Sequence, residues 1–224
     1  MKFDKCYQII IEQNSLLIPR RIEDRQKHYI RILLLKVQEY IKDPKKHGDL
    51  ILANYPLSEL PSELKYVAGD LFISYSKIRT LPPGIVIEGN LIAYDSDLEI
   101  ITKDCIIKGD ISVSSSKIRK LPENQKKYKT LDLNKTLIEV LPDNLSVTDL
   151  SLRGCKQLKS LPRGLKVKRT LNLHGTNIKE LPNDIIVKGI IYLSATPLRK
   201  KYTREQIKTM CPGITGEIFL NEFS

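Results

Sequence analysis

Histidine and cysteine have the side chains of this chain best suited to chemistry, because they serve as metal ligands, nucleophiles and proton carriers. None of the three histidines, His28, His47 and His174, lies in the pattern of a metal site or a known nucleophile motif. The four cysteines lie far apart, without a C-x-x-C pair or a Cys/His cluster at zinc spacing; they are Cys6, Cys105, Cys155 and Cys211. The sequence therefore predicts no metal site, no disulfide framework and no catalytic residue.

Glycine is spaced regularly in the chain, but not in the pattern of a phosphate-binding loop. Gly69, Gly89, Gly109 and Gly189 follow one common period, which a turn before each of several strands explains. We therefore expect no nucleotide site, no cofactor and no enzymatic activity, unless residues distant in sequence come together.

Length and composition are those of a folded soluble protein. The 224 residues are 41% hydrophobic and 28% charged, which excludes disorder along the whole chain. The longest apolar stretch, 7–18, is interrupted by Glu12, Gln13 and Asn14, so the sequence predicts neither a membrane-spanning helix nor a secretory signal. We expect a cytoplasmic protein without a membrane partner, unless it is secreted without a signal.

A repeat organises most of the chain. Units that start at the first residue of an L-x-L core are spaced by 21, 20, 20, 20, 19, 21 and 20 residues; they start at Leu50, Leu71, Leu91, Ile111, Leu131, Leu150, Leu171 and Ile191. Each unit holds a short alternating strand, such as 70–74, and a return segment. The return segment contains Leu-Pro in six of eight units, whereas the third and eighth have Ile101-Thr102 and Lys201-Tyr202. One unit cannot bury its apolar face alone, so we expect stacked units with parallel strands around a Leu and Ile core.

Five positions after the first core residue, the units carry a row of mostly short polar side chains. Seven of eight are Ser, Thr or Cys; the row is Tyr55, Ser76, Ser96, Ser116, Thr136, Cys155, Thr176 and Thr196. A buried turn needs hydrogen-bond partners for its backbone, and short hydroxyl side chains provide them. We therefore expect this row to be structural.

The pattern L-x-L-x-x-[ST]-x-I-x-x-L-P-x-x-[LI]-x-V-x-G resembles the leucine-rich repeat in its short bacterial form. The array is most similar to those of type III secreted effectors of enteric bacteria and of phage-encoded proteins. The resemblance implies an α/β leucine-rich-repeat solenoid whose concave face is a parallel β-sheet that binds protein. Some secreted relatives add a ubiquitin-ligase domain with a Cys-x-Asp motif. None of the four cysteines matches that motif, so the resemblance implies binding and not catalysis.

The segments that flank the array lack its period and are expected to cap it. Residues 1–47 have helical periodicity and predict two helices, separated near 15–19, of which the second runs from about 20 to 42. Residues 48–202 form the eight repeats. Residues 203–224 predict a short helix with a capping box at Thr203 and Gln206, followed by a G-x-L-x-L-like segment that could add a ninth strand.

Side chains that alternate with the core residues are expected to line the concave face. This row is mixed and mildly acidic, and Phe72, Ile92 and Tyr94 lie near its start. Exposed aromatic side chains are typical interface anchors, although the N-terminal cap could instead cover these three. The sequence predicts partner binding at Phe72, Tyr94, Asp110, Asp132, Arg153 and His174. We interpret the protein as a non-catalytic effector or inhibitor of a host protein, which it would meet in the host cytoplasm.

The excess of positive charge gives an alternative interpretation. The formal charge is +11 and the pI is about 9.4, which favours an acidic partner. A basic flank follows the hydroxyl row, and it predicts nucleic-acid binding at Arg79, Arg119, Lys159 and Lys179. The same residues could simply be a solvated surface that prevents association through the sheet edge.

Overall fold

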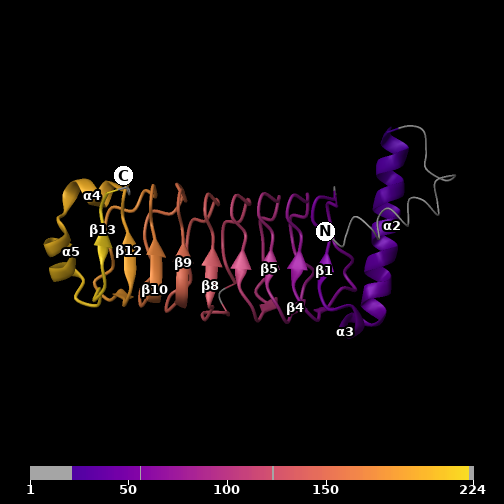
Figure 1. Cartoon of the computed structure of the whole chain (residues 1–224), viewed down its shortest axis with the longest axis horizontal. Coiled ribbons are helices and arrows are strands. Elements are labelled where there is room, and N and C mark those ends of the chain that lie inside the picture. The colour runs from indigo at the N-terminus through magenta and orange to yellow at the C-terminus, as the bar shows by residue number, and fades with distance from the viewer. Residues whose placement is uncertain (1–21, 56, 123, 222–224) are drawn as a thin grey trace.

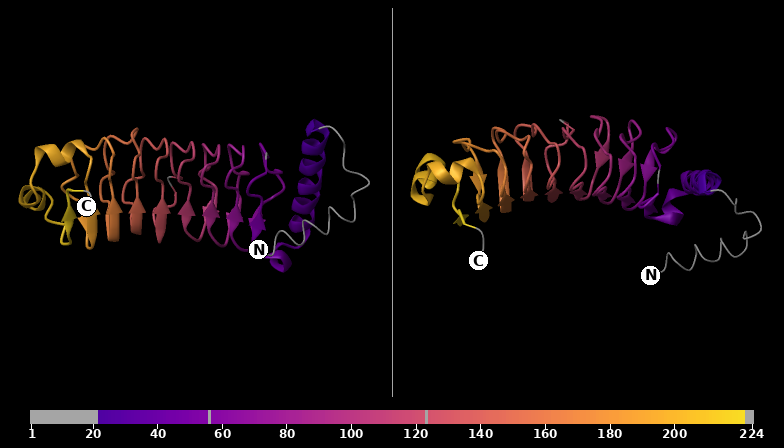
Figure 2. Two further views of the ribbon diagram at one scale, coloured as in Figure 1. Left: turned by 45° about the horizontal axis from the view of Figure 1, so that its top comes forward. Right: turned by 90° about the horizontal axis from the view of Figure 1, so that it is seen from above.

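The computed structural model describes residues 22–55, 57–122 and 124–221. Its main feature is a ladder of parallel strands, sheet A, that runs the length of the array (Figure 1). Consecutive strands along the ladder are β1 (Leu50–Ile51), β3 (Leu71–Phe72), β5 (Leu91–Ile92), β7 (Ile111–Ser112), β8 (Thr130–Asp132), β9 (Ser146–Ser151), β10 (Lys166–Asn172), β12 (Ile190–Tyr192) and β13 (Ile218–Phe219). Strand β11 (Ile186–Val187) also pairs with β10. Figure 2 shows these strands side by side in a gently bent row.

The register of sheet A follows the repeat found in the sequence. Leu50 pairs with Leu71, Leu71 with Leu91, and the same position continues to Ile191. Each of these core residues is at most 5% exposed, so each unit buries its apolar side chains against the next. The fold is a leucine-rich-repeat solenoid, as predicted.

The return segments form a second, smaller parallel sheet in the first half of the array. Sheet B contains β2 (Tyr66–Val67), β4 (Val86–Ile87) and β6 (Ile106–Ile107). At its edge, the Gln125 side chain takes the place of a further strand. It accepts a hydrogen bond from Ile107 N–H at 3.2 Å and donates one to Ile107 C=O at 2.5 Å.

In the first four units the strands are shorter than the sequence predicts, whereas β9 and β10 are longer. The range 70–74 contains only the two-residue β3. Asp70 is only half in the ladder: its C=O accepts a hydrogen bond from Leu50 N–H at 2.8 Å, but its N–H donates to the side chain of Asp49 and not to a backbone carbonyl. Beyond β3, the chain turns at Tyr75, whose φ is 57°.

Helix α2 (Ile22–Lys42) lies across the N-terminal end of the array (Figure 1). Its Leu33, Val37 and Tyr40 are buried, and the Tyr40 hydroxyl accepts a hydrogen bond from Ala68 N–H at 3.0 Å. The helix ends where predicted, and a short helix that was not predicted, α3 (Pro44–His47), follows it directly. The first predicted helix lies outside the described residues. None of the helices in the described ranges is long and apolar enough to cross a bilayer.

Two short helices and a strand cover the C-terminal end. Helix α4 (Pro197–Lys201) was not predicted, and α5 (Arg204–Met210) starts with the expected capping box between Thr203 and Gln206. Strand β13 then pairs with β12, where Ile218 lies beside Ile191. The chain thus adds a ninth strand to the eight strands of the repeats.

Candidate functional site

One backbone feature sets the direction of every loop after a strand of the repeats. The residue four positions after the first core residue has a left-handed φ, between 49° and 72°, in all eight units; these residues are Asn54, Tyr75, Asp95, Ser115, Lys135, Gly154, Gly175 and Ala195. Only two of the eight are glycine, although this conformation is costly for other residues. This position has no signal in the sequence, because its residue types vary from unit to unit.

The hydroxyl row next to this turn is structural, as predicted. Thr136, Thr176 and Thr196 are buried and donate hydrogen bonds of 2.6–2.9 Å to the carbonyl three residues earlier. Cys155 Sγ donates to Leu133 C=O at 2.9 Å. These four residues therefore stabilise their turns, whereas the buried Ser116 Oγ of the same row has no hydrogen-bond partner within the described residues.

The strand face is the surface formed by the side chains of sheet A that alternate with the core. At its N-terminal end it is apolar: Ile51, Phe72 and Ile92 occupy neighbouring register positions on β1, β3 and β5 and are only partly buried. Tyr94 lies just after β5 and is 38% exposed. Its ring meets that of Tyr75 edge to face, with centroids 5.2 Å apart.

We call Ile51, Phe72, Tyr75, Ile92 and Tyr94 the aromatic end of the strand face. Tyr75 is 52% exposed, but strand alternation does not predict its exposure, because that alternation does not extend into the turn. In the described part of the N-terminal cap, the buried side chains pack into the hydrophobic core at the end of the array. They leave Tyr94 exposed to solvent.

Asp110 lies on the strand face, but it also has a structural role. Just before the strands, each acidic or amide side chain accepts a hydrogen bond from the backbone N–H of the equivalent residue in the next unit. The distances are 2.6–2.9 Å along Asp49, Asp70, Asn90, Asp110 and Thr130. This ladder takes up the backbone N–H groups at the start of β3, β5, β7 and β8, so only part of the Asp110 carboxylate is left for a partner.

The remaining predicted residues follow on later units of the same face. Asp132 accepts a hydrogen bond from Asn134 N–H at 3.1 Å, and Asn134 in turn accepts one from Arg153 N–H at 2.8 Å. Arg153 is exposed, and His174 Nδ1 lies 2.8 Å from Ser194 Oγ. The six predicted residues therefore share one face but extend over six units, and only Phe72 and Tyr94 belong to one compact group.

The first half of the basic flank is neutralised by ion pairs between units. Arg79 pairs with Glu99 at 2.8 Å and Arg119 with Glu139 at 2.7 Å. These contacts lower the pKa of Glu99 and raise that of Arg79, through the hydrogen bond between the two side chains. The prediction for this flank considered only its basic members. Lys159 and Lys179, further along, are exposed.

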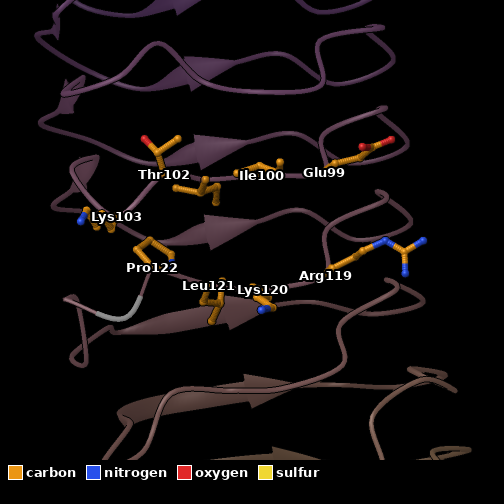
Figure 3. A pocket seen from close by; sticks show the side chains of 9 residues that line it. Glu99, Ile100, Thr102, Lys103, Arg119, Lys120, Leu121 and Pro122 are labelled. Atoms are coloured by element: carbon orange, nitrogen blue, oxygen red, sulfur yellow. The ribbon is translucent and has the colours of Figure 1, made fainter.

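A groove of about 600 Å³ lies where the third unit lacks Leu-Pro, between the return segments of the third and fourth units. Its surface is mostly apolar and includes Ile100, which is 50% exposed. Figure 3 shows Glu99 and Arg119 pointing away from the centre of the groove, and Thr102 Oγ1 donates to Asp104 Oδ1 at 2.5 Å. These polar groups are engaged elsewhere, so Lys103 and Lys120 are the charged lining residues that could orient a small ligand.

The described cysteines are not suited to nucleophilic chemistry. Cys105, Cys155 and Cys211 are buried free thiols, and burial raises the pKa of Cys155 and of Cys211. A thiolate is the reactive form, so both are held as inert thiols. Over residues 22–55, 57–122 and 124–221, no group of three His, Cys, Asp or Glu side chains could hold a metal ion.

Comparisons with known proteins add little to this description. No family model matches the chain, and no curated protein matches it. Among solved structures, the chain is similar to one titled "Structure of Shigella effector LRR domain", with 16% sequence identity and a TM-score of 0.37, over 82% of this chain and 88% of that chain. The class of the protein therefore follows from its own repeats and sheet, which define a leucine-rich-repeat solenoid.

Proposed function

We propose that this solenoid is a non-catalytic recognition module that binds another protein through the aromatic end of its strand face. The observation that carries the proposal is the grouping of five partly buried or exposed apolar and aromatic side chains on the strands and turns of three adjacent units. Grouped apolar side chains on a surface mark interaction sites more often than scattered ones do.

The scaffold favours binding because it is already ordered. Each strand pairs with its neighbours, so few backbone degrees of freedom would be lost when a partner binds. Tyrosine and phenylalanine supply large contact areas at a small cost in side-chain entropy. We assign the anchoring role to Phe72 and Tyr94, with Tyr75 supporting the Tyr94 ring.

The other predicted residues extend the same surface with polar groups. Asp110, Asp132, Arg153 and His174 lie on successive units toward the C-terminal end. Partly exposed polar groups around an apolar centre give orientation and specificity more than affinity. We therefore expect substitutions at these four residues to weaken binding less than substitution of Phe72 or Tyr94.

For the biological use, we propose an effector or inhibitor that acts on a host protein in the host cytoplasm. The support is the resemblance of the 20-residue repeat to arrays of secreted effectors and phage-encoded proteins. A host-cell lysate is therefore the source in which a partner should be sought.

The test is capture of partners from nuclease-treated host lysate by the tagged protein, comparing wild type with Phe72→Ala/Tyr94→Ala. The matched control is Tyr192→Ala/Phe219→Ala, which removes the same two residue types from a stacked pair at the other end of the strand face, where the ring centroids are 5.4 Å apart.

We expect the first variant to lose a defined protein and the control to keep it. Each anchor contributes about 2 kcal/mol or more, so affinity for the purified partner should fall by about 30-fold or more per anchor. Loss of the partner only in the control would place the interface at the C-terminal end and contradict the proposal.

A further inference from the structure

The net positive charge of the protein comes from one part of the chain. Residues 153–208 contain 14 Lys and Arg against three Asp and Glu, a formal charge of +11, which equals that of the whole protein. The rest of the chain is therefore neutral, with 23 residues of each sign. All 14 basic residues of this range are exposed.

The structure shows how this difference arises along one column of the solenoid. In seven units, the residue that follows the buried Leu or Ile of the return segment is charged. In the first four of these it alternates in sign: Arg79, Glu99, Arg119, Glu139. Backbone hydrogen bonds of 2.9–3.4 Å join these residues from unit to unit, and their side chains form the ion pairs described above.

The next three units break the alternation. Their residues at this position are Lys159, Lys179 and Arg199, which we call the basic column. Across residues 22–55, 57–122 and 124–221, no carboxylate lies within ion-pair distance of any of the three. Lys200, which follows Arg199 in α4, adds positive charge at the same end, whereas Lys201 is paired with Glu180 at 3.2 Å.

We propose that the basic column binds the phosphate backbone of a nucleic-acid duplex. Neighbouring strands lie about 4.8 Å apart in a sheet, so the three charges span about 10 Å. One strand of a duplex advances about 3.4 Å along the axis per phosphate while it winds around that axis, so about two to three phosphates come within reach of the long side chains of the column. The number and the spacing of the charges thus suit a regular line of phosphates.

The kind of contact follows from what the column lacks. Lys and Arg bind phosphates through charge, whereas single-stranded nucleic acid is held by aromatic side chains on which bases stack. No aromatic residue is a member of the column. The contact therefore reads no bases, and two unrelated duplex sequences should bind with equal affinity. This surface is separate from the aromatic end of the strand face, so it goes beyond the proposed function.

The experiment measures fluorescence anisotropy of a labelled 20-base-pair DNA duplex with the full chain, from about 50 to 200 mM salt. The test variant is Lys159→Gln/Lys179→Gln/Arg199→Gln. The matched control is Arg79→Gln/Lys117→Gln/Arg119→Gln, which removes the same formal charge from residues paired with Glu99, Asp97 and Glu139. Circular dichroism and thermal unfolding verify that each variant is folded.

For the test variant, the slope of log K against log salt should become shallower by about 3, roughly one for each phosphate contact. Its affinity at low salt should fall by about tenfold or more, while the control should keep nearly the slope and affinity of wild type. Equal weakening of both variants would show a general effect of net charge and overturn the proposal. So would absence of duplex binding at about 50 mM salt, or binding of labelled poly-glutamate in its place, which would indicate an acidic protein.

Discussion

Replacing Ala195 by Gly should stabilise the protein, although glycine usually destabilises. Ala195 has a φ of 54°, and an L-residue in this left-handed region costs roughly 1–2 kcal/mol. Glycine avoids that cost, but its greater backbone freedom stabilises the unfolded chain by about 0.4–1 kcal/mol. Since Ala195 is exposed and loses only a methyl group, the free energy of unfolding should rise by about 0.5–1 kcal/mol.

The reciprocal change is Gly175→Ala, in the preceding unit. Gly175 has a φ of 66°, and the nearest atom to an added Cβ is Lys156 Nζ at 3.7 Å, so the substitution introduces strain without a clash. It should lower the free energy of unfolding by about the amount that Ala195→Gly adds.

Urea and thermal unfolding measure both effects, which correspond to about 2–4 °C per kcal/mol for a chain of this size. The control is Ala53→Gly, one position earlier in the repeat, where φ is not positive; it should destabilise by about 0.5–1 kcal/mol. If Ala195→Gly destabilised as much as Ala53→Gly, the argument from the left-handed turn would be refuted.

Three further predictions concern the edge of sheet B, one ion pair and the thiols. Gln125→Ala removes both hydrogen bonds to Ile107 and should destabilise by about 1–3 kcal/mol in urea unfolding; an unchanged midpoint would exclude the capping role. For Asp149, burial raises the pKa, but hydrogen bonds, first from Arg169, outweigh it and lower the pKa below 3.8. The interaction of Asp149 with Arg169 therefore stabilises the fold above pH 3.8, and this stabilisation is lost as the pH falls below that value. The difference in stability between wild type and Arg169→Gln should shrink over the same range. A difference independent of pH would contradict this. The three described cysteines should resist alkylation in the folded protein and react after unfolding, as mass spectrometry of labelled peptides would show.

The repeat made the solenoid predictable from the sequence. Core positions recur with nearly constant spacing, and each has to be buried against its neighbours, so eight strands and their register could be derived without the structure. Strand lengths could not, because they depend on which backbone groups take side-chain partners. The ladder from Asp49 through Asp110 is an example, and the recurrence of Asp and Asn before the strands was its sequence signal.

The candidate site was predictable only in part. Alternation along the strands identified Phe72 and Tyr94, but not Tyr75, whose exposure depends on a turn of unusual φ. The prediction of the basic flank was incomplete for another reason. Its charges were counted without the acidic residues at equivalent positions in neighbouring units, and Glu99 and Glu139 neutralise Arg79 and Arg119. Ion pairs between units become visible in a sequence only when the columns are compared across repeats.

The two proposed surfaces make a last prediction, because they belong to different units of a stacked scaffold. The aromatic end involves the first three units, and the basic column the sixth to eighth. At about 4.8 Å per unit, their centres lie roughly 20–25 Å apart along the array. In the sixth and seventh units, Arg153 and His174 of the strand face precede the turn, whereas Lys159 and Lys179 of the basic column follow it, so two ligands can bind to different sides of these units. We therefore expect saturating duplex to leave the affinity for the protein partner unchanged within about twofold, because the two surfaces share no residue. Calorimetric titration of the partner, with and without duplex, measures this. Competition between the two ligands would mean that one of them spans both ends of the array, and the assignment of separate surfaces would be wrong.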